Sequence, residues 1–334
     1  MEYRSLGRTG MQVSMQCLGC MMFGRRAPES DSMDIIDRAI DAGINFLDMA
    51  NVYGHGSSEE TVGKALKRND KRGRIVLATK VHGTMDEADP NAHGNHRRHI
   101  IEQCEASLRR LQTDYIDLYQ IHRPGSDIPI DETLRALDDL IRAGKVRYIG
   151  TSTFAAWQVM ESLWVSKELG LNRFVCEQPP YHLLDRRIER ELVPMAITYG
   201  IGIIPWSPLA GGFLSGKYKR GQARVQGSRF EKENEWADRH FADRAFDVLE
   251  TLEKIAGEKG CTVSQLALAW CAQQPGITSP IIGPRTMEQL EDNLGALNVK
   301  ITDEDKTRID AVAPPGREIV SYYEADFGPH QYRW

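Results

Sequence analysis

The sequence contains no apolar run long enough to cross a membrane. The longest nearly apolar stretch, 201–214, is too short for a bilayer and is interrupted by Pro205 and Pro208. No apolar segment follows residues 1–5, so we expect no export signal. The cysteines are few and far apart, which indicates reduced thiols in a cytoplasmic protein rather than a disulfide framework. They are Cys17, Cys20, Cys104, Cys176, Cys261 and Cys271.

A surplus of positive charge is also missing. The chain has 42 Lys and Arg against 47 Asp and Glu, which gives a formal net charge of -5. Nucleic-acid-binding domains are usually strongly basic, so we expect no nucleic-acid partner and no membrane partner. A hydrophobic fraction of 41% and a charged fraction of 27% are typical of a folded globular chain. Its 334 residues correspond to two average domains or to one large α/β barrel.

Short apolar runs alternate with amphipathic stretches along the whole chain. Each run has the length of a strand that is buried on both faces. The runs are 44–47, 75–78, 116–121, 148–150, 174–176, 202–204 and 280–282, and one more near 13–18 brings them to about eight. The stretches between them have helical spacing. Leu134, Leu137 and Leu140, for example, share one helical face that ends at Gly144.

This alternation predicts parallel strands, either in a doubly wound sheet or in a closed eight-stranded barrel. A doubly wound dinucleotide-binding sheet carries Gly-x-Gly-x-x-Gly after its first strand, and the sequence has neither this motif nor a P-loop. We therefore predict an α/β fold with a single (β/α)8 TIM-barrel domain over 1–334. A bare barrel needs about 250 residues. The surplus falls in a long loop after the seventh strand, 217–244, and in an irregular aromatic C-terminal tail, 313–334.

Polar residues follow almost every predicted strand. Active sites of such barrels lie at the carboxyl ends of the strands, so these residues are candidates for function. In strand order they are Asp48, Lys80, His122, Ser152, Gln178, Trp206 and Gly283.

Tyr53, five residues after Asp48, adds an acid to this edge of the barrel. A phenol has an ordinary pKa of about 10 and is a poor proton donor near pH 7. A neighbouring ammonium, here Lys80, favours the phenolate and makes the proton easier to release. Asp48 would keep Lys80 charged and in place, and His122 could donate a hydrogen bond to a carbonyl oxygen. This set of residues predicts proton delivery to a carbonyl that becomes an alcohol.

Two patterns that could indicate a metal have simpler explanations. Cys17 and Cys20 have zinc-like spacing, but a strand places residues three apart on opposite faces, and no second pair completes a site. Four histidines near the end of the third strand have no Cys or carboxylate at ligand spacing. They are His82, His93, His96 and His99. We therefore predict no metal.

The stretch 43–59, which contains Asp48 and Tyr53, resembles the signature of the aldo-keto reductase family. The segments 77–80 and 119–122 resemble its lysine and histidine strands. The segments 203–212 and 214–218 resemble its cofactor segment, and 282–293 resembles its adenosine-phosphate site. The resemblance covers essentially the whole chain, in order. It implies a barrel that binds NADP(H) without a Rossmann domain and reduces a small aldehyde or ketone to an alcohol.

The resemblance also implies the role of each catalytic residue. Tyr53 would be the general acid, tuned by Lys80 and Asp48, and His122 would orient the carbonyl. The sequence departs from the family pattern at Met49, where members often have Thr, and at Thr153, where many have Asn.

The remaining implied roles concern the cofactor and the substrate. From nicotinamide to adenine, the cofactor-binding residues would be Ser152, Gln178, Trp206, Ser207, Leu209, Gly211, Lys217, Gly283, Arg285, Gln289 and Asn293. Arg285 would face the 2′-phosphate, because a planar guanidinium suits phosphate geometry. Met22, Phe23 and Arg123 would line the substrate pocket. The loop 217–244 would cover the cofactor, and the tail 313–334 would lie on the substrate side.

Two alternative functions remain open at this point. Some barrels of the family resemble regulatory β subunits of potassium channels, which bind the cofactor but need little turnover. A Schiff-base aldolase would use Lys80 as a nucleophile, although Asp48 beside it would keep the amine protonated. The identity of the substrate and the oligomeric state are also left open.

Overall fold

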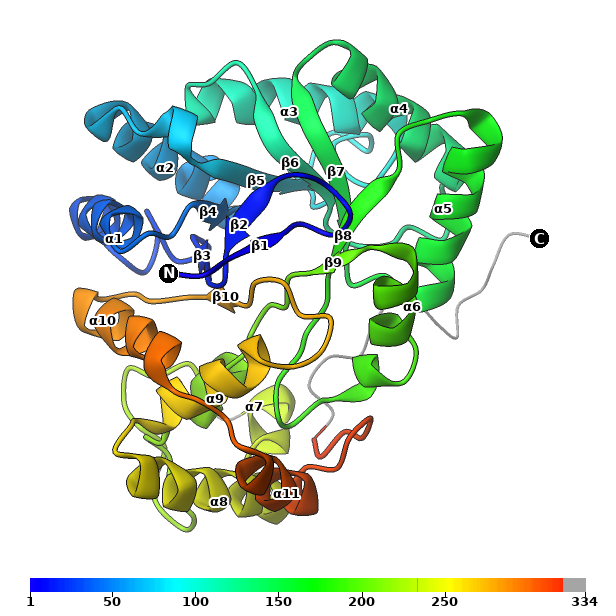
Figure 1. Cartoon of the computed structure of the whole chain (residues 1–334). Coiled ribbons are helices and arrows are strands. Elements are labelled where there is room, and N and C mark those ends of the chain that lie inside the picture. Colours follow the sequence, from blue (N-terminus) through cyan, green and yellow to red (C-terminus); the bar gives the residue numbers. More distant parts are fainter. Residues whose placement is uncertain (233, 321–334) are drawn as a thin grey trace.

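The computed structural model describes residues 1–232 and 234–320. Within this part of the chain, eight parallel strands form one curled sheet with helices on its outside (Figure 1). The strands are β3 (Cys17–Gly19), β4 (Phe46–Asp48), β5 (Val76–Val81), β6 (Ile116–Ile121), β7 (Val146–Ser152), β8 (Phe174–Gln178), β9 (Gly202–Ile203) and β10 (Ile281–Ile282). Strands β3 to β9 pair in sequence order, and β10 pairs back with β3. The predicted (β/α)8 barrel is confirmed.

The barrel closes between β9 and β10 by separate hydrogen bonds rather than by a continuous ladder. Ile281 N donates to Pro205 O at 2.8 Å, and Thr278 N donates to Ile203 O at 2.8 Å. Each of these two strands has only two residues. The apolar runs are longer than the strands because Pro205 and Pro280 have no N–H to contribute to a ladder.

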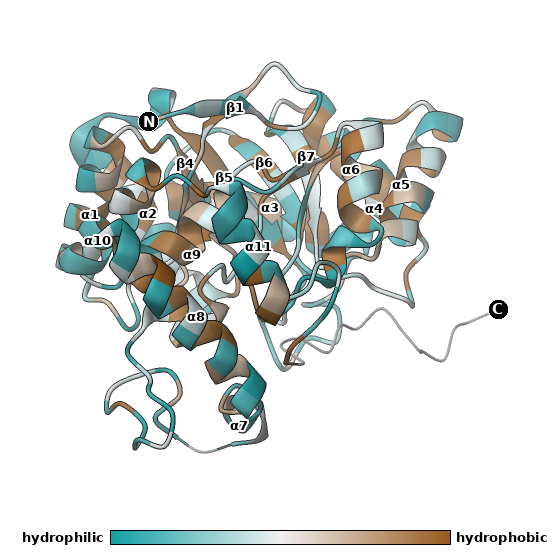
Figure 2. Ribbon diagram, turned by 60° about the horizontal axis from the view of Figure 1, so that its bottom comes forward, coloured by the Kyte–Doolittle hydropathy of each residue, from teal (hydrophilic) through white to brown (hydrophobic). Residues whose placement is uncertain are grey.

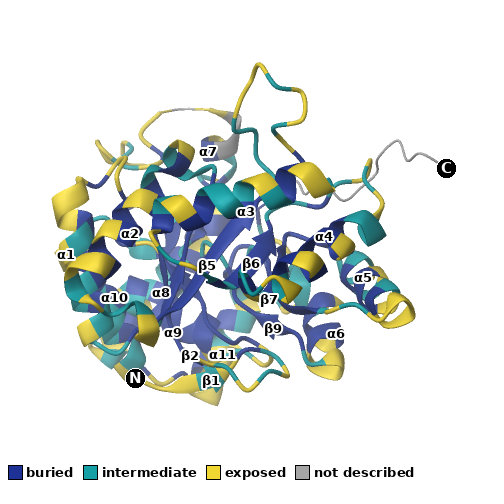
Figure 3. Cartoon of the chain, turned by 90° about the horizontal axis from the view of Figure 1, so that it is seen from above, coloured by how far each residue is buried: buried dark blue, intermediate teal, exposed yellow. Residues whose placement is uncertain are grey.

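The outer layer consists of amphipathic helices that bury one face against the strands (Figure 3). They are α1 (Glu29–Asp41), α2 (Ser57–Asn69), α3 (Arg97–Leu111), α4 (Ile130–Arg142), α5 (Ala156–Leu169), α6 (Leu192–Tyr199), α8 (Asp243–Lys259), α9 (Val263–Ala272), α10 (Met287–Gly295) and α11 (Asp303–Val312). In α4, Asp131 and Glu132 lie in the first turn and Arg142 in the last, which complements the helix dipole. In the described residues, no helix is long and apolar enough to cross a membrane.

The N-terminal segment differs from its prediction. The apolar run near 13–18 is not one strand: Val13 belongs to an antiparallel hairpin of β1 (Tyr3–Ser5) and β2 (Gln12–Ser14), and the first barrel strand begins only at Cys17. The Ser14 hydroxyl donates to Gln16 O at 2.7 Å, which turns the chain between the two. The hairpin lies near the amino end of β9, since Arg8 N donates to Gly200 O at 2.9 Å. It therefore lies at the end of the barrel opposite to the candidate site.

The predicted loop 217–244 is built around aromatic side chains. It contains the short helix α7 (Glu235–Arg239) and lies at the lower edge of Figure 2. Phe213, just before the loop, stacks on Tyr218 with ring centroids 5.7 Å apart, and Phe230 and Phe241 also contact Phe213. Beyond the loop, two helices, α8 and α9, precede β10.

The first part of the predicted tail packs on the segment that follows β8. Arg186 N donates to Arg317 O at 2.9 Å, and Ile319 N donates to Leu184 O at 2.8 Å. The aromatic residues of the tail lie outside the described residues. They are Tyr322, Tyr323, Phe327, Tyr332 and Trp334.

Candidate active site

Asp48, Tyr53 and Lys80 meet at the carboxyl ends of β4 and β5. Lys80 Nζ lies 2.6 Å from Asp48 Oδ2, 2.8 Å from Met49 O and 3.4 Å from the Tyr53 hydroxyl. Lys80 is fully buried, whereas Tyr53 is half-buried. Burial by itself would lower the pKa of Lys80, but the carboxylate of Asp48 and the phenol of Tyr53 together raise that pKa above its ordinary value. The three oxygens use all three ammonium protons, so the lysine is charged and held in one position.

His122 follows β6 and lies beside Tyr53. The two ring centroids are 5.6 Å apart, and the rings are nearly perpendicular, at 82°. Burial and the charges of Lys80 and Arg123 lower the pKa of His122 well below its ordinary value. A neutral imidazole carries one N–H donor and one acceptor, so His122 can donate one hydrogen bond without bringing a positive charge.

A buried carboxylate fixes the turn that carries Tyr53. The turn is the 3-10 segment η1 (Tyr53–Gly56), which leads directly into α2. Gly56 has φ 98°, and a Cβ there would lie 2.5 Å from Arg110 Cδ. Arg110 Nε and the hydroxyl of Thr79 each donate to Glu59 at 2.6 Å. Glu59 therefore ties the start of α2 to β5, the strand that carries Lys80.

The second oxygen of Asp48 is held by two amides from the barrel interior. Gln178 Nε2 lies 2.9 Å and Gln120 Nε2 lies 3.2 Å from Asp48 Oδ1. Gln178 was predicted as a site residue from its position after a strand, but Gln120 was missed because it lies inside an apolar run. Its position two residues before His122 was the available signal, because residues i and i+2 share one face of a strand.

The predicted nicotinamide residues lie on neighbouring strands. Ser152 and Gln178 are register partners at the last positions of β7 and β8, and the Ser152 hydroxyl donates to Gln178 O at 2.9 Å. Trp206 is half-buried just beyond β9, and Ser207, which follows it, has φ 55°. The structure therefore brings these residues to the same end of the barrel as Lys80.

Two cations lie near each other where the dinucleotide phosphates are expected. Within the described residues, neither Lys217 nor Arg285 forms an ion pair with a carboxylate. Burial and the charge of Arg285 lower the pKa of Lys217. Gln289 Oε1 accepts from Arg285 N at 2.8 Å, and Asn293 is buried, 6% exposed. Two neighbouring cations without a protein anion fit a ligand that carries phosphate groups.

The residues predicted to line the substrate pocket differ in how far the structure buries them. Met22 and Arg123 are half-buried, but Phe23 is fully buried in the hydrophobic core and is not brought to a pocket. Arg123 donates to Thr153 Oγ1 at 3.0 Å. Thr153 has φ 64°, a left-handed conformation that is strained for a β-branched residue and that Asn adopts more easily.

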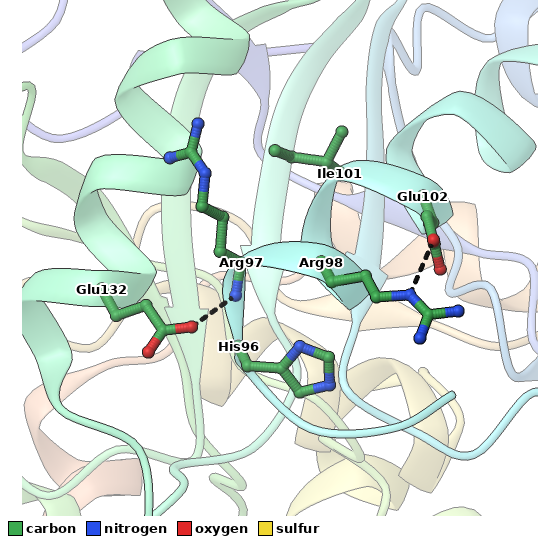
Figure 4. Close-up of a pocket in the computed structure, with 6 residues that line it drawn as sticks. All are labelled: His96, Arg97, Arg98, Ile101, Glu102 and Glu132. Carbon is green, nitrogen blue, oxygen red and sulfur yellow. Dashed lines mark hydrogen bonds and ion pairs between the residues drawn. The ribbon is translucent and has the colours of Figure 1, made fainter. Parts of the chain in front are cut away.

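A separate surface groove lies along α3 and α4 (Figure 4). It is lined by His96, Arg97, Arg98, Ile101, Glu102 and Glu132, none of which is a predicted site residue. Its charged side chains already have partners: Arg98 Nε donates to Glu102 Oε1 at 2.9 Å, Glu132 Oε1 accepts from Arg97 N at 2.9 Å, and the Arg97 guanidinium is paired with Asp139. The groove is therefore a solvated helix face rather than the candidate active site.

The residues considered above as metal ligands have other surroundings in the structure. Across residues 1–232 and 234–320, no group of three or more His, Cys, Asp or Glu is arranged to hold a metal ion. His82 Nδ1 lies 2.9 Å from Asn95 Oδ1. Cys17 and Cys20 are buried free thiols.

Residues 17–314 match the model of the aldo/keto reductase family. This chain belongs to that family. It is 39% identical to an uncharacterized oxidoreductase, YrpG, of Bacillus subtilis (strain 168), over 97% of this chain and 99% of that protein. It is 38% identical to a probable voltage-gated potassium channel subunit beta of Oryza sativa subsp. japonica, over 93% of this chain and 96% of that protein. Versiconal hemiacetal acetate reductase of Aspergillus parasiticus is 36% identical, over 91% of this chain and 95% of that protein.

Membership of the aldo/keto reductase family supports an oxidoreductase that uses a nicotinamide dinucleotide. The fold places the matching polar side chains at one end of the barrel, where they surround Lys80. The two neighbouring cations, Lys217 and Arg285, lie in the loop after β9 and two residues before α10, not in a glycine-rich turn after a first strand.

A buried acid beside this aldo/keto reductase site should make stability depend on pH. Glu177 on β8 accepts from Phe154 N at 3.0 Å and is hydrogen-bonded to the Thr151 hydroxyl. Burial outweighs these bonds and raises the pKa of Glu177 from 4.5 to about 8. The contribution of Glu177 to stability is therefore complete below pH 4.5, where both states hold the proton, and is lost as pH rises through about 8.

We expect the Glu177→Gln variant to match the wild type in free energy of unfolding near pH 4.5. At about pH 8.5 it should be more stable by about 2–4 kcal/mol, because its amide cannot ionise. Urea unfolding at the two pH values measures the difference. A stability difference that does not change with pH would contradict the assignment.

Proposed function

We propose that this aldo/keto reductase reduces aldehydes or ketones to alcohols with NADPH, which when bound supplies the hydride. The observation that carries the proposal is the position of Lys80 Nζ, 2.6 Å from Asp48 Oδ2 and 3.4 Å from the Tyr53 hydroxyl. A half-buried phenol beside a buried, paired ammonium is a proton donor with its charge compensation already in place.

The chain's own residues handle the proton and the position of the carbonyl. The Tyr53 hydroxyl donates its proton to the carbonyl oxygen as that oxygen gains negative charge, and the phenolate that is left is stabilised by the ammonium of Lys80. Asp48 keeps this lysine charged. The neutral imidazole of His122 donates its N–H to the same carbonyl oxygen and orients it beside Tyr53.

Other residues of the same barrel end would hold the dinucleotide. Ser152 and Gln178 would hold the carboxamide, and Trp206 would cover the nicotinamide ring. Lys217 and Arg285 would neutralise the phosphates, which is supported by the absence of a carboxylate partner for either cation among the described residues. The loop 217–244 would cover the cofactor, and its aromatic interior supports an ordered cover.

The Arg285→Ala variant should bind NADPH about 10–100-fold more weakly than the wild type, because one or two charge-assisted hydrogen bonds to the 2′-phosphate are lost. Binding of NADH should change by less than about threefold, since it has no 2′-phosphate. Fluorescence titration with both dinucleotides measures the two constants. Arg308→Ala is a matched control, because Arg308 lies on α11, outside the proposed cofactor site, and is paired with Glu258. If the variant binds NADPH and NADH more weakly by the same factor, Arg285 does not contact the 2′-phosphate.

The relatives named channel subunit beta support a second candidate, a cofactor-binding regulatory subunit with little turnover. NADPH oxidation with a panel of simple aldehydes separates the two: turnover supports the reductase, and tight NADPH binding without turnover supports the subunit. A Schiff-base aldolase is disfavoured by the raised pKa of Lys80, because a protonated amine is not a nucleophile. Borohydride treatment in the presence of a carbonyl compound tests this alternative, and we expect no covalent product on Lys80.

A further inference from the structure

We infer that Gln120 is a positioning residue that, together with Asp48, fixes which end of the Gln178 amide faces a bound nicotinamide dinucleotide. The inference rests on the proposed function and adds a residue to it. Asp48 Oδ1 lies 2.9 Å from Gln178 Nε2 and 3.2 Å from Gln120 Nε2. Gln178 Nε2 also lies 3.3 Å from Gln120 Oε1. The carboxylate and the two amides therefore form a closed triangle of hydrogen bonds inside the barrel.

The charge of Asp48 sets the direction of every bond in this triangle. Asp48 is paired with the ammonium of Lys80 and, as a carboxylate, can only accept hydrogen bonds. Both amides must therefore turn their Nε2 groups toward Asp48. The atom of Gln120 that faces Gln178 is Oε1, and it accepts from Gln178 Nε2 at 3.3 Å. The two amide orientations follow from one negative charge.

The consequence for Gln178 is that its two N–H groups are both used inside the barrel. Its Oε1 makes no hydrogen bond among the residues that the structure describes. Gln178 is at the last position of β8 and is 2% exposed. The atom that it can offer a ligand is thus an acceptor. An acceptor suits the NH₂ group of a carboxamide and does not suit a carbonyl oxygen in the same place.

Gln120 is itself held tightly. Its side chain is fully buried, and its Oε1 also receives the Cys176 thiol at 3.9 Å. Its register partner on β7 is Gly150, where a Cβ would lie 2.5 Å from Cys176 Sγ and 3.3 Å from Gln120 Cγ. The absence of a side chain at Gly150 makes the space for the amide. Gln120 therefore has one available position, and that position fixes its neighbour.

The test compares NADPH with its 3-acetylpyridine analogue, which keeps the carbonyl oxygen but has a methyl group instead of the NH₂ donor. We expect the wild type to bind NADPH about tenfold more tightly, which corresponds to one hydrogen bond. In Gln120→Leu, the amide of Gln178 keeps its hydrogen bond to Asp48 but loses the acceptor of its second N–H, which can then donate to the acetyl oxygen. The preference should then fall to about threefold or less. Fluorescence titration measures binding independently of catalysis.

Two further variants distinguish a change in the orientation of the Gln178 amide from general damage to the barrel interior. In Gln120→Glu, burial beside Asp48 keeps the new carboxyl protonated, so its O–H donates to Asp48 and its C=O accepts from Gln178, and the preference should return. Cys104→Ala removes a buried thiol of α3 that does not contact this cluster, and it should leave the preference unchanged. If Gln120→Leu does not fold, Gln120→Met replaces it.

The results that would overturn the inference differ from those that would refute the proposed function. A folded Leu or Met variant that keeps the tenfold preference overturns the inference, and so does a Glu variant that fails to restore it. A wild type that binds neither dinucleotide instead refutes the proposed function.

Discussion

Replacement of Tyr53 by phenylalanine should lower kcat for aldehyde reduction by about 10²–10⁴-fold. The hydroxyl is the only group removed, and its one hydrogen bond in the structure, to Lys80 Nζ at 3.4 Å, is long. The ring is half-buried and keeps its edge contact with His122. We therefore expect the NADPH dissociation constant to stay within about threefold and the free energy of unfolding to change by less than about 1 kcal/mol.

Steady-state kinetics and NADPH titration together check this prediction. Tyr119→Phe is a suitable control, because Tyr119 lies on β6 and donates to Ile100 O at 3.2 Å, away from the candidate site. It should cost about 1 kcal/mol of stability and leave kcat unchanged. If Tyr53→Phe loses cofactor affinity instead of turnover, the proton donor has been misassigned.

The candidate site could be predicted from the sequence because its residues lie at strand ends. Each apolar run predicts a buried parallel strand, and the polar residue that follows it lies at the end of the barrel where active sites are found. Asp48, Lys80 and His122 could be predicted in this way without knowledge of their contacts. Gln120 could not be predicted in this way, because the sequence does not show which residue forms hydrogen bonds with a single polar side chain inside an apolar run. Its partners come from β4 and β8, far away in the chain.

The parts of the fold that escaped prediction depend on contacts between distant residues. Tyr218, Phe230 and Phe241 are separated by charged stretches without helical or strand period, so their cluster around Phe213 has no local signature. The N-terminal hairpin could not be predicted either, because Val13 and Cys17 belong to one apolar pattern in the sequence but to two different sheets in the structure. Periodicity identifies elements, but it does not show which element pairs with which.

Replacement of Lys80 by methionine should affect both stability and turnover. Lys80 is fully buried and Asp48 is 3% exposed, so the variant leaves a carboxylate without its cation in the barrel interior. Breaking a buried pair in this way costs about 3–5 kcal/mol. The phenolate of Tyr53 also loses its charge compensation, so kcat should fall by about 10²–10⁴-fold.

The double variant Lys80→Met with Asp48→Asn separates these two effects. Asparagine removes the uncompensated charge but keeps an oxygen for Gln120 and Gln178, so most of the lost stability should return. Turnover should not return, because no cation remains beside the Tyr53 hydroxyl. Urea unfolding and steady-state kinetics on the two variants give both quantities. Recovery of turnover together with stability would mean that Lys80 acts only through the fold, and the proton-delivery role of the Asp48–Lys80–Tyr53 chain would have to be abandoned.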